Sequence, residues 1–192
     1  MRNIAETRLV RHLTVEEMQA ILNAPVPDHW DGIRDRAMLH LCFAGGLRVS
    51  ELIGLRLADV RLQSPASILI HGKGRKERCL PLWKETITAL RAWWTVRGEV
   101  GVPELFVNTR GVSMTRSGFE YILHKHTQTA ATQCPDLLTK RVSPHVLRHT
   151  CALTILQATK DLRKVSLWLG HAHIETTEMY TGSPQNSEKI VR

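Results

Sequence analysis

The stretch Ser143-Pro144-His145-Val146-Leu147-Arg148-His149 decides how this chain is expected to fold. Its serine can cap a helix and its proline fits the first helical position, so the stretch predicts a helix over Pro144–Thr159. His145 and Arg148 stand three residues apart and would share one face of that helix, while the valine and leucine between them would supply buried contacts. The fold is therefore expected to rest on a helix whose first turns carry cationic groups.

Working outward from this helix, capping signals and helical periodicity predict seven further helices. Thr14 and Glu17 form a capping box at the first of them, and glycines follow several of the predicted ends. The predicted ranges are 14–23, 28–44, 49–55, 84–96, 115–129, 161–169 and 174–180.

The sequence pattern changes from helical to strand-forming between residues 60 and 82. Segments 67–71 and 78–82 are rich in strand-forming residues and flank a basic turn, and 60–62 could add a third strand. Residues 105–107 are expected to be extended, and 130–141 to form a loop. The fold class is therefore mixed α/β, mainly α-helical with a small antiparallel β-sheet, and it lacks the repeated βαβ alternation of a Rossmann-type fold.

Composition excludes several protein classes. The 192 residues are 43% hydrophobic and 23% charged, which is ordinary for a globular domain and excludes disorder over most of the length. No run of about 18 apolar residues could span a membrane, and the first residues lack a signal peptide's apolar core. Four scattered cysteines without a Cys-x-x-Cys pair indicate a reducing cytosol rather than a disulfide framework. The formal net charge of +8 favours a polyanionic partner, with nucleic acid the commonest.

Two basic segments could bind phosphate. Arg48 follows a Gly-Gly break at a helix start, where its guanidinium could face an anion, although a plain surface ion pair with Glu51 is the alternative. The turn between the strands adds four cations within six residues, beside two glycines that permit close approach. They form either a solvated turn or a finger along a phosphate backbone; they are Lys73, Arg75, Lys76 and Arg78.

Histidines and a tyrosine complete the candidate groups. His145 and His149 have a zinc-binding spacing, but the glutamate that follows the first histidine in such motifs is absent. Leu169-Gly170-His171 precedes Tyr180 by nine residues, and simple packing is the alternative role for that tyrosine. No paired carboxylates suit a two-metal nuclease. Arginine and histidine donors suit a phosphate whose charge grows in the transition state, and a tyrosine can act as nucleophile.

Taken together, these segments resemble the catalytic domain of the tyrosine recombinases, the phage integrase and Xer-type family. The resemblance runs from about residue 9 to 181 and rests on four motifs in order. They are Gly46-Leu47-Arg48-Val49-Ser50-Glu51-Leu52, Gly72-Lys73-Gly74 with Lys76-Glu77-Arg78, His145-Val146-Leu147-Arg148-His149, and Leu169-Gly170-His171 with Tyr180. On this basis 11–182 is expected to be the catalytic domain, 1–10 a linker or arm, and 183–192 a tail.

The resemblance implies a role for each candidate residue. Tyr180 would attack the scissile phosphate and form a 3′-phosphotyrosine, while Arg48 and Arg148 would hold the non-bridging oxygens. His145 and His171 would donate hydrogen bonds, and Lys73 would be the general acid. The expected DNA contacts are Arg75, Lys76 and Arg78. No metal, ATP or other cofactor is implied. The six catalytic candidates are expected to converge around one basic pocket.

The implied partners are double-stranded DNA and further copies of the chain, in a tetrameric synapse, with accessory DNA-binding proteins and no membrane. The implied location is the bacterial cytoplasm, at the nucleoid, in a prokaryote or mobile element. A separate DNA-binding domain usually precedes this domain in the family. Three alternatives stay open: a non-enzymatic DNA-binding module, a type IB topoisomerase, and a metal-dependent hydrolase using His145, His149, His171 and His173.

Overall fold

The computed structural model describes residues 12–72, 74 and 76–170. The expected arm, the expected tail and the expected helix over 174–180 lie outside the described residues. So do four of the candidate site residues, namely Lys73, Arg75, His171 and Tyr180.

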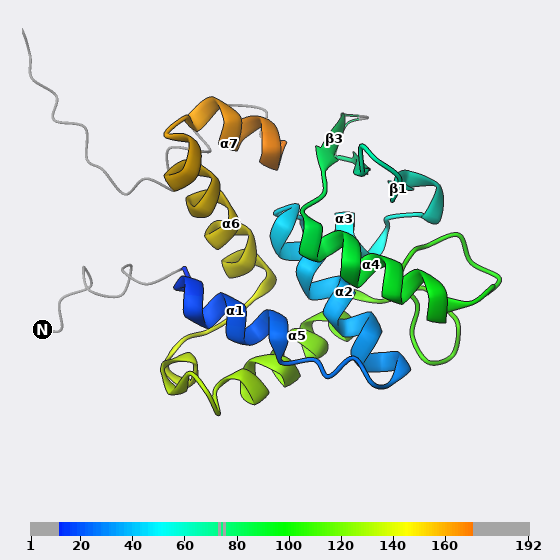
Figure 1. The fold of residues 1–192 in the computed structure, drawn as a ribbon, viewed down its shortest axis with the longest axis horizontal. Coiled ribbons are helices and arrows are strands. Elements are labelled where there is room, and N and C mark those ends of the chain that lie inside the picture. Colours follow the sequence, from blue (N-terminus) through cyan, green and yellow to red (C-terminus); the bar gives the residue numbers. More distant parts are fainter. Residues whose placement is uncertain (1–11, 73, 75, 171–192) are drawn as a thin grey trace, which may run out of the picture.

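Helices make up most of the described chain (Figure 1). The α-helices are α1 (Val15–Asn23), α2 (Trp30–Ala44), α3 (Val49–Ile53), α4 (Lys84–Arg97), α5 (Arg116–Ala130), α6 (Pro144–Thr159) and α7 (Leu162–Leu169). Two short 3-10 helices are η2 (Leu57–Asp59) and η3 (Pro135–Thr139). None of the helices in these ranges is both long and apolar enough to cross a membrane.

The three strands form one antiparallel sheet in the order β1 (Val60–Arg61), β2 (Ser67–His71), β3 (Glu77–Pro81). Ile68 pairs with Leu80 and His71 pairs with Glu77, so β2 and β3 form the predicted hairpin. Pro81 ends β3 at the edge of the sheet, where a residue without an N–H group disrupts no central pairing. Together these elements are the mixed, mainly helical fold with a small sheet that the sequence predicts.

Capping groups place the helix ends where the sequence predicts them. Thr14 and Glu17 make both hydrogen bonds of the capping box at α1. Ser143 accepts from the backbone N–H of Val146 at the start of α6, and Asp161 caps α7 in the same way. These side chains satisfy backbone donors that a helix leaves unpaired at its first turn.

Helix α2 occupies the centre of the core and packs against α1, α4 and α6. Its residues Leu39, Leu41 and Cys42 are completely buried. Trp30 at its start meets Trp93 of α4 edge to face, with ring centroids 4.9 Å apart. Because α6 packs on α2, Arg148 of α6 lies next to the end of α2.

The structure differs from the sequence prediction at a few segments. The expected loop over 130–141 contains η3, which begins at a proline in its first turn. Helix α2 begins at Trp30 instead of residue 28, α3 ends at Ile53 instead of residue 55, and β3 spans Glu77–Pro81 instead of 78–82. The differences at the helix and strand termini are end effects, because local signals fix a helix or strand more firmly than its last residues.

Candidate active site

The turn between α2 and α3 presents Arg48. Gly46 has a positive φ of 54°, and a Cβ there would come within 2.6 Å of Leu169 Cδ2 and 3.1 Å of Cys151 Sγ. Glycine is therefore required both by the backbone and by the close approach of α6 and α7. Leu47 is fully buried, and Arg48 is the N-cap residue of α3 with a side chain 47% exposed. The turn thus anchors its leucine in the core and points an arginine outward.

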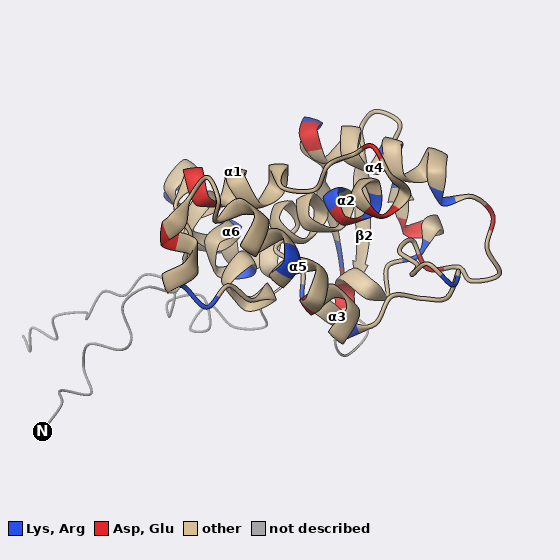
Figure 2. Cartoon of the chain, turned by 90° about the horizontal axis from the view of Figure 1, so that it is seen from below, with Lys and Arg blue, Asp and Glu red and all other residues tan. Residues whose placement is uncertain are grey.

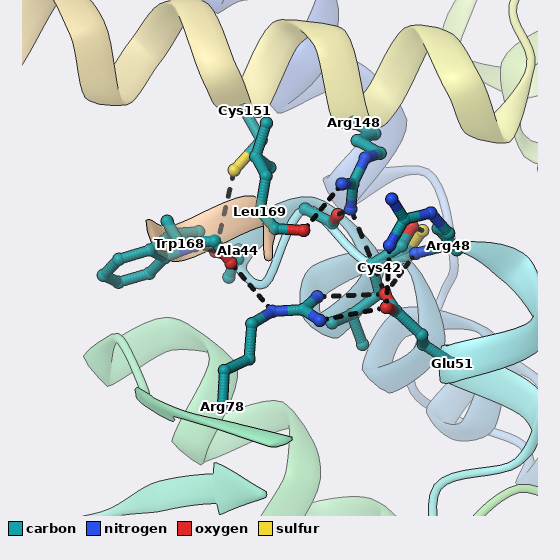
Figure 3. Close-up of polar contacts among 11 residues, drawn as sticks. Cys42, Ala44, Arg48, Glu51, Arg78, Arg148, Cys151, Trp168 and Leu169 are labelled. Carbon is teal, nitrogen blue, oxygen red and sulfur yellow. Dashed lines mark hydrogen bonds and ion pairs between the residues drawn. The ribbon is translucent and has the colours of Figure 1, made fainter. Parts of the chain in front are cut away.

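Arg148 comes from α6 and is buried, with only 5% of its side chain exposed. Its guanidinium donates to the carbonyl of Gly46 through Nη1 and to the carbonyl of Leu169 through Nη2, the second at 2.7 Å. Figure 3 shows the side chain held between these two segments. One arginine therefore joins the first and last motifs of the chain.

Glu51 is the point on which three arginines meet (Figure 3). Its side chain is 4% exposed, and its Oε1 lies 3.1 Å from Arg48 Nη1. Arg78 of β3 binds both carboxylate oxygens at 2.9 Å, and Arg148 Nη1 lies 3.9 Å from Oε2. Three guanidinium charges thus share a single carboxylate, which leaves the cluster with positive charge.

The ionisation of Glu51 follows from these contacts. Burial alone raises the pKa of a carboxyl group, but here hydrogen bonds from Arg78 and from the Arg48 amide oppose it, together with the charges of Arg78 and Arg148. The result is a pKa of Glu51 below its ordinary value. The carboxylate therefore stays charged at neutral pH and fixes the arginines around it.

Two arginines also bind the end of α7. Arg78 Nε donates to the carbonyl of Trp168 at 2.9 Å, one residue before the carbonyl that Arg148 binds. These carbonyls lie in the last turn of a helix, where the backbone leaves acceptors unpaired and the dipole favours cations. Gly170 follows with φ 65°, and a Cβ there would approach Arg78 Nη1 to 2.9 Å. The segment that leads to His171 is thereby fixed to the arginine cluster.

An open hollow of about 990 Å³ lies over this cluster. Helix α3, the hairpin and the end of α7 supply its walls, and Lys76 adds an exposed cation at the hairpin side. Figure 2 shows that basic and acidic segments are otherwise interspersed over the described chain. Arg48, Glu51 and Arg78 line this hollow, while Arg148 is buried and meets them at Glu51. The site is therefore a local concentration of positive charge and suits a phosphate group.

The structure brings some of the expected site residues together and leaves others apart. Arg48 and Arg148 meet at Glu51, and Lys76 borders the same hollow. His145 lies in the first turn of α6 with an exposed side chain, and no hydrogen bond among the described residues involves that side chain. Arg78, expected to contact DNA, has its guanidinium bound inside the protein and is only 11% exposed.

The sequence alone points to Glu51 only as an ion-pair partner for Arg48, although the residue has a larger role in the site. That pair does form, but the same carboxylate also holds Arg78 and lies near Arg148. A glutamate three residues after a helix N-cap is a recognisable capping pattern, and it was visible in the sequence. The link to Arg78 was not visible, because it depends on how the hairpin packs against α3.

A metal centre gains no support from the described residues. Within the ranges described, no group of three His, Cys, Asp or Glu side chains is placed to hold a metal ion. His149 packs near His12, with ring centroids 6.3 Å apart. The remaining ligands of the hydrolase alternative, His171 and His173, lie outside the described residues. All four cysteines are free, as expected for a chain without a disulfide framework.

Comparisons with known proteins agree with this geometry. The chain matches the phage integrase family over residues 11–186. It is 44% identical over 174 residues to the protein y4rC of Sinorhizobium fredii, covering 90% of this chain and 52% of that protein. It is 38% identical over 179 residues to the tyrosine recombinase XerD of Ralstonia nicotianae, covering 91% of this chain and 56% of that protein.

Solved structures give the same result. The XerA recombinase superposes with a TM-score of 0.77 at 30% identity, covering 91% of this chain and 61% of that one. The XerH recombinase bound to its difH substrate superposes with a TM-score of 0.80 at 28% identity, covering 96% and 54%. This chain spans about half the length of the curated relatives it matches. It belongs to the phage integrase family and has the fold of a tyrosine recombinase catalytic domain.

Proposed function

We propose that this chain cleaves and rejoins DNA strands in site-specific recombination, through a 3′-phosphotyrosine intermediate on Tyr180. The observation that carries the proposal is the meeting of Arg48 and Arg148, from separate motifs far apart in the sequence, at one buried carboxylate beside an open basic hollow. Guanidinium groups held in this way are preorganised for a phosphate whose charge grows during reaction. Family membership adds independent support.

The proposed reaction exchanges one phosphodiester for another. The hydroxyl of Tyr180 passes its proton to a site histidine, His145 or His171, as its oxygen forms a bond to phosphorus, and the bond from phosphorus to the 5′-oxygen breaks. Lys73 gives a proton to the departing 5′-oxygen, because an alkoxide is a poor leaving group. The 5′-hydroxyl of another strand later attacks the phosphotyrosine, so the bond is restored without ATP or a metal ion.

Arginine and histidine side chains stabilise the transition state in this proposal. Arg48 and Arg148 bind the non-bridging oxygens, a geometry that the planar guanidinium favours and lysine cannot copy. His145 and His171 donate hydrogen bonds to the same phosphate. Glu51 is the positioning residue, because its carboxylate fixes the direction of both arginines.

DNA is the proposed partner. Lys76, exposed at the hollow, and Arg75 contact the backbone near the scissile phosphate, while Arg78 supports the site from within. One neighbouring structure is a recombinase bound to its DNA substrate. Exchange between two duplexes needs four strand cleavages, so the proposal includes a tetrameric assembly on DNA, with accessory DNA-binding proteins and a location at the nucleoid.

The test is covalent capture on a nicked DNA substrate that loses its 5′-hydroxyl fragment after cleavage. Wild-type chain should accumulate a denaturation-resistant protein–DNA adduct, and Tyr180→Phe should form none while still binding DNA. Tyr121→Phe, at an exposed position of α5, is the matched control and should form the adduct normally. DNA binding without any wild-type adduct would instead identify a non-enzymatic binding module.

A further inference from the structure

His71 stands at the base of the hairpin between two carboxylates. It is the last residue of β2 and pairs across the sheet with Glu77, the first residue of β3. Its Nδ1 lies 2.9 Å from Glu77 Oε1, and its Nε2 lies 2.9 Å from Asp59 Oδ1. Both ring nitrogens are thus at hydrogen-bond distance from acidic oxygens.

This geometry fits only one protonation state of the ring. A neutral imidazole has one N–H donor, and its other nitrogen is an acceptor, whereas ionised carboxylates only accept. Both contacts can therefore be hydrogen bonds only when His71 is an imidazolium. Hydrogen bonding to Asp59 is the main cause that raises the pKa of His71 above its ordinary value, and Glu77 adds to it.

Asp59 gives the clamp a fixed anchor. Its side chain is 10% exposed, and its Oδ2 accepts from the backbone N–H of Arg56 in the turn that follows α3. His71 therefore ties the hairpin to the chain just beyond the helix that carries Arg48. Arg78 makes a second tie from β3 to Glu51, and Gly72 N–H donates to the Lys76 carbonyl at 2.7 Å to close the turn.

We propose that His71 is a positioning residue of this site: its imidazolium clamps the hairpin base onto Asp59 and Glu77, and so holds the turn that carries Lys73 for strand cleavage. The catalytic part of this inference rests on the proposed function. Lys73 follows His71 by two residues in the sequence, so the turn has little length in which to absorb movement at its base. The clamp is distinct from the arginine cluster because its carboxylates are Asp59 and Glu77, whereas the arginines meet at Glu51.

The direction of the pH effect follows from the raised pKa. The clamp is complete while His71 is protonated and is lost as pH rises through that pKa. Asp59 and Glu77 are the groups facing the ring from the neighbouring elements. The other charged side chains around the same hollow are Arg48, Glu51, Lys76 and Arg78.

The first arm of the test is independent of catalysis. NMR would follow the His71 ring and the exchange protection of the Gly72 amide from about pH 5.5 to 8.5, a range that brackets the ordinary histidine pKa. We expect Gly72 protection to fall about two- to five-fold as His71 deprotonates, the factor typical of exposed ion pairs. His71→Gln should show the low protection at every pH, and His124→Gln, an exposed histidine of α5, should behave as wild type. Protection that does not change while His71 titrates overturns the clamp.

The second arm measures covalent adduct formation on nicked DNA over the same pH range. At the acidic end, wild type should form the adduct about two- to five-fold faster than His71→Gln. The two rates should become equal above the raised pKa of His71. Asp59→Asn should move this change in the rate ratio to lower pH, because it removes the carboxylate that raises the pKa of His71. A ratio that is constant with pH overturns the positioning role. A chain that makes no adduct at any pH refutes the proposed function and the positioning role together, while the amide measurement still decides the clamp.

Discussion

A single carboxylate organises the charged residues of this site. Glu51 binds Arg78 through both oxygens and Arg48 through side chain and backbone, and it lies 3.9 Å from Arg148. Removing one partner from such a buried cluster leaves the others without a counter-charge, which is far more costly than losing an exposed pair. Glu51 therefore connects the stability of the fold to the direction in which its arginines point.

Glu51→Gln tests this connection. Because the pKa of Glu51 is lowered from 4.5, its stabilising effect is present above that value and is lost as pH falls through the lower folded-state pKa. We expect the variant to lose about 3 kcal/mol of unfolding free energy at pH 7, and the difference from wild type to shrink in acid.

Urea unfolding at a series of pH values measures the effect. Glu120→Gln is the control, because Glu120 is half exposed and lies 3.7 Å from Arg116 on the surface of α5. That variant should change the unfolding free energy by less than about 1 kcal/mol. A Glu51→Gln difference that stays constant between neutral and acidic pH would contradict the account.

The proposed role of Lys73 as general acid has a direct chemical test. Replacing the bridging 5′-oxygen of DNA by sulfur gives a leaving group with a thiol pKa of about 8.5, which departs without a proton donor. Lys73→Ala should therefore be slowed about 100- to 10,000-fold on ordinary DNA and largely rescued on the sulfur-bridged substrate. Cleavage rates under single-turnover conditions measure both effects.

The matched variants decide which residue is the acid. Arg48→Ala should not be rescued, because its proposed partners are the non-bridging oxygens, which are unchanged. Rescue of Lys76→Ala in place of Lys73→Ala would move the role of acid along the hairpin.

At the scale of elements, the site depends on how closely α2, α6 and α7 approach one another. The α2–α3 turn passes beneath Leu169 and Cys151 at Gly46, and α7 ends on two arginines. Burial raises the pKa of Cys151 to about 12, so its thiol stays protonated and acts as a packing group. The elements that present the arginines therefore meet without a gap at this turn.

Gly46→Ala should reveal this close approach. The new Cβ would need a positive φ and would overlap Leu169 Cδ2, so we expect a loss of about 2 to 5 kcal/mol in unfolding free energy. Gly111→Ala is the control, since Gly111 also has a positive φ, of 73°, but the nearest atom to a new Cβ is Val100 Cγ1 at 3.6 Å, an ordinary van der Waals distance. It should lose only about 1 to 2 kcal/mol. Equal losses in urea unfolding would show that crowding at Gly46 is unimportant.

The sequence predicts elements well and contacts between elements poorly. Helix α6 has the predicted bounds because Ser143, Pro144 and the apolar spacing all act locally. The hairpin is predicted for the same reason. The binding of Arg78 to Glu51 is not predictable in this way, because it joins residues 27 apart and depends on the packing of β3 beside α3. The sequence marks the arginine, but only tertiary structure decides whether it faces DNA or the protein.

At the scale of the whole molecule, only the exposed part of the excess positive charge is available to bind phosphates. The chain has 26 Lys and Arg residues against 18 Asp and Glu, yet several arginines near the site are bound to carbonyls or to Glu51. Exposed cations such as Lys76 are then the groups available to DNA phosphates. Binding is expected to be weak and strongly dependent on salt.

The salt dependence of DNA binding separates exposed cations from structural ones. The logarithm of the binding constant should fall with the logarithm of salt concentration, by about 0.9 per phosphate contact. Lys76→Ala should reduce that slope by about one, whereas Arg110→Ala, exposed in a loop away from the hollow, should leave it unchanged. Arg78→Ala should instead lower stability. Fluorescence anisotropy at several salt concentrations measures the slopes, and a flat response for wild type would contradict the prediction.

In the proposed reaction, Tyr180 is the nucleophile of a DNA-joining site that Arg48, Arg148 and Glu51 organise. The most direct measurement is mass spectrometry of the protein after reaction with nicked DNA, digestion and mapping of the nucleotide-bearing peptide. The account predicts a nucleotide 3′-phosphate attached to Tyr180, absent from Tyr180→Phe and from Arg148→Ala. An adduct mapped to Tyr121 or to any other residue, or one that persists in Tyr180→Phe, would contradict it.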